Sequence, residues 1–301
     1  MKESEVLIRS SKNEHVSNMV EAMKGFDFKS EKPSGQFGRV VKITTGNLTI
    51  DNTLDLEFTV PFDDDTEANE AEIRVYNLTK KTIGCFEANK ELTITAGYGK
   101  DAGIIFSGVI ASVKTKWSGQ DKVTTIKVID SVSLKEKDIE SISFKAGVKA
   151  SYILKTLVGK LNLPIAVFKV KRDHSYKEAV TVSGGLMSAI KQYAEVCGVS
   201  AYINKRKVYV RPLSDGDNLN FTVTVDTGLI DSPEEFEEEI QSEEYTDTVK
   251  GIKFKMLLEH RITTASIIKL KSKNYSGTYR VREGEHVCNE TDFYTEITAI
   301  E

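Results

Sequence analysis

The sequence predicts a mainly β chain with two antiparallel β domains and a small α+β domain inserted between them. Three observations support this prediction: alternating apolar and polar residues in short strands, helical periodicity confined to the middle of the chain, and a motif that occurs twice, about 169 residues apart. The motif is an aromatic-Ser-Gly tripeptide that precedes a strand, a polar turn and a second strand, and its copies begin at Phe106 and Tyr275. Two related β domains explain the repeat. Chance is the alternative, because Ser-Gly turns between strands are common.

Residues 1–36 are expected to form a short amphipathic helix and a linker. Within residues 12–25, one helical face carries Val16, Met19, Val20 and Met23, and Gly25 is placed to stop the helix. A lone helix of this length is marginal in water, so its apolar face must be covered. Its own β domain and a partner subunit are both open as the covering surface.

Residues 37–145 are expected to form the first β domain. Leu54, Leu56, Phe58 and Val60 alternate with polar residues, which makes one face of a strand apolar, and Pro61 is expected to end that strand. The alternation recurs at residues 71–75, 92–96, 104–110 and 123–129. Short strands at this spacing indicate an antiparallel barrel or sandwich.

Residues 146–213 are expected to form the α+β insert. One helical stripe runs from Ile153 to Leu161, and a second runs from Leu186 to Cys197 and is closed by Gly198. Strands are expected at residues 165–171, 199–203 and 208–210, the last two as a hairpin around Asn204-Lys205.

Residues 214–301 are expected to form the second β domain. The period-two pattern resumes at Phe221, and further strands are expected at residues 249–257, 267–271, 277–281 and 293–300. We expect the acid-rich stretch Asp231–Glu244 to interrupt these strands. This stretch has two interpretations: a solvated face, or the wall of a lumen whose negative field repels DNA phosphates and lets a duplex slide.

Composition narrows the class of protein. The 301 residues suffice for two or three domains, and the formal charge is -4. No concentrated basic face of the kind that binds nucleic acid is visible. No apolar run approaches the roughly 18 residues of a membrane span, and the N-terminus lacks a signal-peptide core, so we expect a soluble protein made in a cytoplasm. Cys85, Cys197 and Cys288 are odd in number and far apart, which is typical of reduced thiols.

No motif predicts a catalytic residue, a metal site or a cofactor. The loop Asp63–Asn69 offers carboxylates to calcium, but an EF-hand needs Gly and Glu where this chain has Ala68 and Arg74. His286 and Cys288 can face one metal ion from a strand, yet no second ligand pair accompanies them.

The sequence contains no motif for phosphate binding or for nucleophilic catalysis. The glycine-rich stretch Gly97–Gly103 lacks the GxxxxGK[ST] order of a phosphate loop, and a hairpin turn explains it better. The four histidines sit in no nucleophile motif. Acid pairs for glycoside hydrolysis cannot be singled out among 45 Asp and Glu residues.

Seven segments carry a family resemblance. They are Phe62–Leu78, Leu92–Tyr98, Ile105–Gly108, Thr227–Glu234, Ser276–Val281, His286 and Phe293–Ile297. These segments resemble phage baseplate hub proteins, in particular the hubs of contractile tails and of PBSX-like defective prophages, which are distant relatives of the T4 baseplate hub. The similarity covers most of the chain from about residue 40. The motifs are structural, so they indicate a family and not a chemistry.

The resemblance implies a structural protein with no enzymatic activity: a homotrimeric hub whose two tube-like β-barrel domains form a pseudo-hexameric ring. Its implied partners are further copies of itself, the tail tube protein on one side, the central spike or a tail lysin on the other, and other baseplate proteins. No membrane and no specific nucleic acid is implied as a partner, although DNA passes through the lumen of such a ring. The implied location is the virion tail baseplate, after synthesis and assembly in the cytoplasm of the bacterial host.

Two segments depart from the family pattern. Residues 1–36 are polar and carry a helix, and the loop Leu258–Ile262 is charged where relatives tend to have a small turn with Pro or Gly. The first leaves the N-terminal partner open, and the second leaves the shape of one ring face open.

The contacts between subunits are expected at three segments: the Asp63–Asn69 loop, the Gly97–Gly103 turn and the Glu234–Tyr245 stretch. The individual candidates are Asp63, Asp65, Asn69, Tyr98, Lys100, Glu237, Glu238 and Tyr245. Exposed strand edges and loops would close into a ring by heterologous contacts, and closure would satisfy backbone groups that otherwise invite aggregation.

Two other functions are open. A tail-associated peptidoglycan hydrolase or cell-wall-binding module would use the insert, whose basic stretches at residues 169–172 and 205–207 suit an anionic wall polymer, although a solvated hairpin also accounts for them. A tail-tube subunit or a secretion-system counterpart shares the fold. It has one barrel per chain, so the second β half argues against it.

Overall fold

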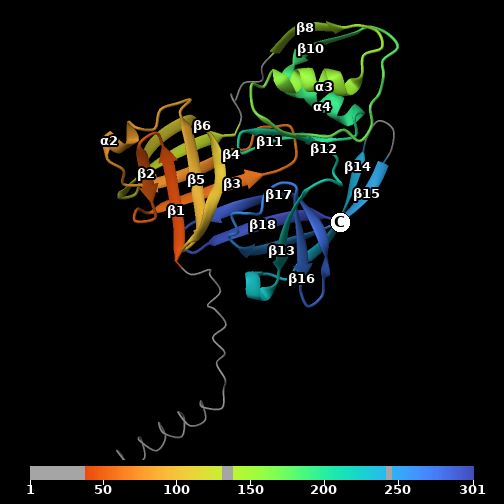
Figure 1. The fold of residues 1–301 in the computed structure, drawn as a ribbon. Coiled ribbons are helices and arrows are strands. Elements are labelled where there is room, and N and C mark those ends of the chain that lie inside the picture. Colours follow the sequence, from red (N-terminus) through yellow and green to blue (C-terminus); the bar gives the residue numbers. More distant parts are fainter. Residues whose placement is uncertain (1–37, 131–137, 242–245) are drawn as a thin grey trace, which may run out of the picture. The chain divides into compact units, whose positions relative to one another are not determined.

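The computed structural model describes residues 38–130, 138–241 and 246–301 (Figure 1). Strands make up most of its regular structure, so the predicted mainly β class is confirmed. The helix expected within residues 12–25 lies outside the described residues. No helix in the described ranges is long and apolar enough to cross a bilayer.

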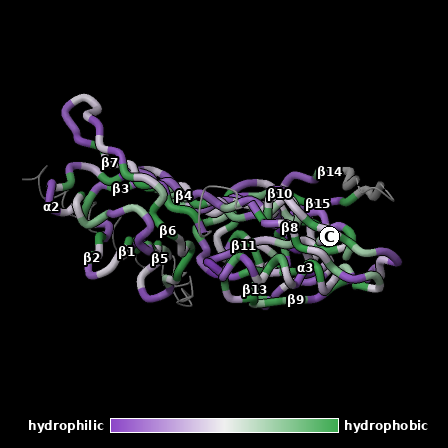
Figure 2. The backbone as a smooth tube through the Cα atoms, turned by 90° about the horizontal axis from the view of Figure 1, so that it is seen from above, coloured by the Kyte–Doolittle hydropathy of each residue, from purple (hydrophilic) through white to green (hydrophobic). Residues whose placement is uncertain are grey.

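The first β half, residues 39–129, contains seven strands and one short helix. These elements are β1 (Arg39–Thr45), β2 (Leu48–Asp51), β3 (Leu56–Phe62), β4 (Glu70–Tyr76), α2 (Lys80–Ile83), β5 (Glu91–Tyr98), β6 (Asp101–Ser118) and β7 (Asp121–Ile129). Leu56, Phe58 and Val60 are buried, as their alternation predicts, whereas Leu54 precedes β3 and is 41% exposed. Figure 2 shows hydrophilic and hydrophobic residues interspersed along the backbone.

The expectation that Pro61 ends its strand is wrong. β3 continues to Phe62. The ladder between β3 and β4 stops at Thr59, so the missing N–H of Pro61 removes no bond from that ladder.

The insert, residues 138–211, contains two helices and five strands. They are β8 (Asp138–Phe144), α3 (Ala150–Gly159), β9 (Ile165–Phe168), β10 (Val180–Gly185), α4 (Leu186–Val196), β11 (Ser200–Asn204) and β12 (Lys207–Arg211). The two predicted helices and the predicted hairpin are confirmed. Lys205 and Arg206 form the two-residue turn of the hairpin, and both have positive φ angles, as a type I′ turn requires.

The second β half, residues 217–300, contains six strands and a 3₁₀ helix. They are β13 (Asp217–Val223), η1 (Val225–Thr227), β14 (Glu234–Gln241), β15 (Thr246–Leu257), β16 (Ser266–Lys271), β17 (Ser276–Cys288) and β18 (Phe293–Ile300). The expected interruption by the acidic stretch is wrong, because β14 lies inside it and pairs with β15. Lys253 and Lys250 lie opposite Glu234 and Glu237, and these opposite charges support the pairing.

The two β halves share one strand order. The first runs β3-β4-β7-β6-β5-β1, and the second runs β14-β15-β18-β17-β16-β13, with every strand in the same place along the chain. Two differences remain: β1 pairs antiparallel with β5 whereas β13 pairs parallel with β16, and β2 has no counterpart. The two halves are therefore topological repeats of each other.

The repeat also preserves register. Ser112 faces Lys127 across β6 and β7, and Glu283 faces Thr298 across β17 and β18, a constant shift of 171 residues that holds along both hairpins. Each hairpin has one register shift at the same place, after Ile110 and after Val281.

The motif that predicted the repeat is not itself equivalent in the two halves. Under the shift of 171 residues Phe106 corresponds to Gly277, the last residue of the second motif, so the two copies of the motif are offset by two residues. Phe106 also lies inside β6 instead of at its entry. The motif found the correct hairpins with the wrong alignment.

Three hydrophobic clusters form the core. The first fills the first β half and takes in Leu258, Cys288 and Phe293 from the second, whereas the third fills the second half and takes in Phe62 from the first. The second cluster belongs to the insert and includes Ile139 and Phe144 of β8, which the sequence-based division assigns to residues 37–145. The domain boundaries themselves stay a prediction.

Replacing Leu154 by Ala tests the core of the insert. Leu154 is fully buried in the second cluster, so we expect Leu154→Ala to lower the free energy of unfolding by about 2–5 kcal/mol. Exposed Lys155 is the matched control, and Lys155→Ala should cost less than about 1 kcal/mol. Urea denaturation measures both values, and equal midpoints for the two variants would contradict the predicted packing.

Candidate assembly interface

One strand pairing joins the two β halves. Residues 284–288 of β17 pair antiparallel with residues 58–62 of β3, with Gly284 opposite Phe62 and Cys288 opposite Phe58. β16 occupies the same edge of β17 only along residues 276–280. We call the pairing of β17 with β3 the seam.

One face of the seam is buried and neutral, and it carries Phe58, Val60, Phe62, His286 and Cys288. His286 shares a hydrogen bond of 2.9 Å with Oγ1 of Thr295, and its ring centroid lies 5.0 Å from that of Phe62. Burial lowers the pKa of His286 to about 3 and raises the pKa of the Cys288 thiol to about 11. At neutral pH both groups are uncharged, which suits an apolar contact between the halves.

The structure places no third metal ligand beside His286 and Cys288 within the described residues. Both side chains are buried at the seam, packed by protein. Within residues 38–130, 138–241 and 246–301, no group of three or more His, Cys, Asp or Glu side chains is arranged to hold a metal ion.

The Asp63–Asn69 loop contacts the second β half from within the chain. Asp64 accepts hydrogen bonds from Nη1 of Arg280 at 2.8 Å and from Nε of Arg282 at 3.4 Å. Asp64 and Arg280 are both buried, so each compensates the desolvation of the other. Burial, with the neighbouring Asp65, raises the pKa of Asp63 to about 7.

The far end of the same loop reaches the insert. Asp130 accepts from the backbone N–H of Asn69 at 3.0 Å and from Nδ2 of Asn69 at 3.2 Å, and that Nδ2 also donates to the carbonyl of Ile203 at 3.5 Å. Burial raises the pKa of Asp130 to about 8. Oδ1 of Asn69 is buried without a hydrogen-bond partner. A proton on Asp130 would supply that partner after a half-turn of the Asn69 amide.

The turn between β5 and β6 is held by the charged loop Leu258–Ile262. Arg261 donates to Glu259 at 2.6 Å and to Asp101 at 3.1 Å, and the ring of His260 lies where a side chain on Gly103 would be. The unusual charge of this loop is thus used inside the chain. Lys100, in the same turn, is exposed.

The remaining interface candidates fall into different environments. Tyr98 is only 7% exposed, packs edge-on against Phe293 and donates its hydroxyl to the carbonyl of Phe293 at 3.3 Å. Glu237 is exposed on β14 and lies 3.5 Å from Lys250, Glu238 follows it on the same strand, and Tyr245 lies outside the described residues. The assignment of these residues to a contact between subunits stays a prediction.

Several strand edges lack a partner within the described residues, among them the outer edges of β2 and β13. Two more belong to the strands that are equivalent to those of the seam. β14 is the last strand of its sheet, and the edge of β6 beyond Ile110 faces no strand. The free part of β6 carries Lys114, Lys116 and Trp117, which the sequence reasoning did not single out. Trp117 is 74% exposed. The signal available in the sequence was an aromatic residue that directly follows Lys114-Thr115-Lys116 in a predicted β domain.

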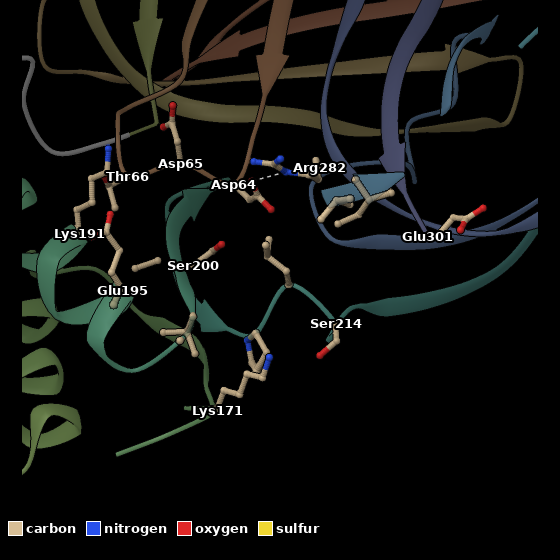
Figure 3. Close-up of a pocket in the computed structure, with 18 residues that line it drawn as sticks. Asp64, Asp65, Thr66, Lys171, Lys191, Glu195, Ser200, Ser214, Arg282 and Glu301 are labelled. Atoms are coloured by element: carbon tan, nitrogen blue, oxygen red, sulfur yellow. Dashed lines mark hydrogen bonds and ion pairs between the residues drawn. The ribbon is translucent and has the colours of Figure 1, made fainter. Parts of the chain in front are cut away.

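A hollow of about 580 Å³ lies beside the Asp63–Asn69 loop, α4 and the C-terminal strand β18 (Figure 3). Its charged lining includes Asp64, Lys191, Glu195 and Arg282, and Asp64 is already paired with Arg282. Its lining contains neither a thiol nor an imidazole. The hollow therefore offers no Cys–His or Ser–His pair for nucleophilic catalysis.

Asp130 should make the fold pH-dependent. Its pKa is raised from 3.8 to about 8 in the folded state, so the folded state binds the proton more tightly and stability is lost as pH rises from about 4 to about 8. In Asp130→Asn the side chain cannot ionise, and its amide can donate to Oδ1 of Asn69. We expect the loss of stability between pH 5 and 8, measured by urea midpoints, to be smaller in this variant. An unchanged pH profile would show that Asp130 is ionised throughout.

Gly284 tests the seam. A Cβ there would lie 2.2 Å from the backbone oxygen of Glu296 and 2.6 Å from the ring of Phe62, so Gly284→Ala should cost about 1–3 kcal/mol of unfolding free energy. Gly159 is the control, because a Cβ there meets nothing within 4 Å and alanine is the better helix former. Chemical denaturation compares the two, and a tolerated Gly284→Ala would mean that the seam is looser than described.

Comparisons with known proteins agree with this architecture. The chain resembles a tail protein from Neisseria meningitidis MC58 (TM-score 0.61, 10% identity, covering 88% of this chain and 97% of that one). It also resembles the 43 kDa tail protein of prophage MuSo2 from Shewanella oneidensis (TM-score 0.65, 5% identity, 88% and 97% covered). A third similar structure is the E. coli c3393 protein, a type VI secretion component described as similar to the T4 tail proteins gp27 and gp5 (TM-score 0.58, 12% identity, 86% and 76% covered).

These identities are low, so the likeness shows a shared fold. No curated protein matches the chain at the level of sequence. The model of the baseplate hub gp41 family, in contrast, matches residues 39–295. The family resemblance seen in the sequence is confirmed: the chain belongs to the baseplate hub gp41 family, whose members are structural components of phage tail baseplates.

Proposed function

We propose that the chain is the structural hub of a phage or phage-like baseplate and assembles as a homotrimer. The observation that carries this proposal is the repeat of one strand order, in matching register, in the two β halves. Three copies of a chain with two equivalent halves present six similar units. A threefold ring of this kind can dock onto a hexameric tail tube on one side and a trimeric spike or tail lysin on the other.

In this proposal each β half is a tube-like domain and the insert, residues 146–213, is a separate domain beside them. Three hydrophobic clusters support a division into three parts, with Ile139 and Phe144 belonging to the cluster of the insert. The ring works in the virion tail baseplate, contacts other baseplate proteins and lets DNA pass through its lumen. It is synthesised and assembled in the host cytoplasm.

We also propose that the chain has no enzymatic activity. The rival function, a peptidoglycan hydrolase or wall-binding module, relied on the basic residues of the insert. Nζ of Lys205 donates to the carbonyl of Ile104 at 2.6 Å, and Arg206 forms an ion pair with Glu91, so both residues hold the insert against the first β half. Burial also lowers the pKa of Lys205 to about 8, which weakens it as a permanent charge for an anionic polymer.

Light scattering on the purified chain tests the oligomer. Three copies of the 33.5 kDa chain give a mass of about 100 kDa, and we expect that mass, with a threefold ring in electron micrographs. A chain that stays monomeric at high concentration, alone and with its tube and spike proteins, would overturn the proposal. Clearing of peptidoglycan in a zymogram that is lost on mutating one carboxylate of the insert would favour the hydrolase instead.

A further inference from the structure

The seam shows how one repeat unit binds the next within a chain. In it, the part of β17 that follows the bulge pairs with β3, the outermost strand of the other half. In the repeat, β6 is the counterpart of β17, and β14 is the counterpart of β3. Both equivalents have an unpaired edge in the described part of the chain, so one copy of the seam is filled and one is open.

The equivalence fixes the register of the open seam. β6 aligns with β17 by the shift of 171 residues, which places Val113 at Gly284 and Trp117 at Cys288. β14 aligns with β3 through the neighbouring strands β15 and β4. Glu72 of β4 lies opposite Lys127, and Lys253 of β15 lies opposite Thr298, the equivalent of Lys127. Glu72 pairs with Thr59 of β3, and Lys253 pairs with Glu234 of β14. Thr59 therefore corresponds to Glu234.

From this alignment we propose that β6 of one copy pairs antiparallel with β14 of a second copy of the chain. The predicted cross-strand pairs are Val113 with Glu237, Lys114 with Phe236, Thr115 with Glu235, Lys116 with Glu234, and Trp117 with Pro233. The inference rests on the proposed ring and supplies the contact that closes it.

Charge complementarity identifies the occupant as a second copy. Lys114 and Lys116 are exposed and form no ion pair with the described residues. Glu234, Glu235 and Glu237 are exposed on the matching stretch of β14. Lys116 falls directly opposite Glu234, and Lys114 falls opposite Phe236 and diagonal to Glu234, so the two edges are oppositely charged in the predicted register.

Apolar and backbone groups fit the same pairing. Trp117, 74% exposed in the single chain, falls opposite Pro233, a buried residue that directly precedes β14, just as Cys288 lies opposite Phe58 in the seam. The open edges present backbone N–H and C=O groups that another strand can satisfy. Pro233 lacks an N–H, but it corresponds to Phe58, the last paired residue of the seam, so it affects only the end of the predicted pairing.

Cysteine cross-linking tests the register. In a Cys85→Ser background, which removes the exposed native thiol, we expect Lys116→Cys with Glu234→Cys to form covalent dimers and trimers with a short thiol cross-linker. The matched control is Lys114→Cys with Glu235→Cys, whose side chains point to opposite faces of the predicted sheet and should not react. Equal cross-linking of both pairs would overturn the proposal.

Charge reversal tests the chemistry. Lys114→Glu with Lys116→Glu should raise the concentration at which the assembly dissociates at least about fivefold. Lys116→Glu alone should weaken the assembly less, and adding Glu234→Lys to Lys116→Glu in the same chain should restore much of that loss. Two results would contradict the β6–β14 contact and leave the proposed ring unaffected. One is a trimer that forms normally in light scattering but does not give the Lys116→Cys/Glu234→Cys cross-link, and the other is a trimer whose stability is unchanged by the charge reversals. A chain that never assembles, alone or with its neighbours, would sink the ring as well.

Discussion

The pairing of β17 with β3 is the contact on which the arrangement of the two β halves depends. It merges them into one continuous sheet, so that neither half has an independent edge at this place. The side chains at the seam belong to the cores of both halves, since Phe62 joins the core of the second half and Cys288 joins that of the first. Neutral His286, with its pKa lowered to about 3, can be buried there without a counter-charge. Separating the two β halves at the seam would therefore expose core residues of both, so we expect the halves to unfold together.

Around the seam, buried polar groups fix the neighbouring parts of the chain. The Asp63–Asn69 loop uses Asp64 to bind Arg280 of the second half and Asn69 to bind Asp130 and the insert. Such groups lose their hydration on folding, so each is costly unless its partner is in place. That cost gives specificity. A shifted β17 would leave the buried charge of Asp64 without Arg280, and a displaced insert would deprive Asn69 of its bond to the carbonyl of Ile203. The Asp63–Asn69 loop is therefore a junction within the chain, and its contact with other subunits stays a prediction.

The sequence was sufficient wherever one face of an element is buried. Period-two alternation located β3, β7 and β18, and period-3.6 stripes located α3 and α4, because burial on one side imposes those periods. It failed for β14, which has five glutamates in eight residues, because that strand depends on lysines from β15, and a single-strand propensity contains no such tertiary effect. The free edge of β6 was invisible for a related reason. Whether an edge is paired depends on the neighbouring strands, and Lys114 and Lys116 read only as polar positions.

The charges on the open edges of β6 and β14 also determine which edges of two copies can pair. Two β6 edges facing each other would bring lysines together, and two β14 edges would bring glutamates together, so pairing of like with like is disfavoured. Only the β6 edge with the β14 edge combines opposite charges, and that contact is heterologous. Heterologous contacts give a closed ring when the rotation per copy divides the circle, and a filament otherwise. In the proposed ring, three copies alternate the seam within a chain with the β6–β14 pairing between chains, so six similar contacts follow one another around the circle.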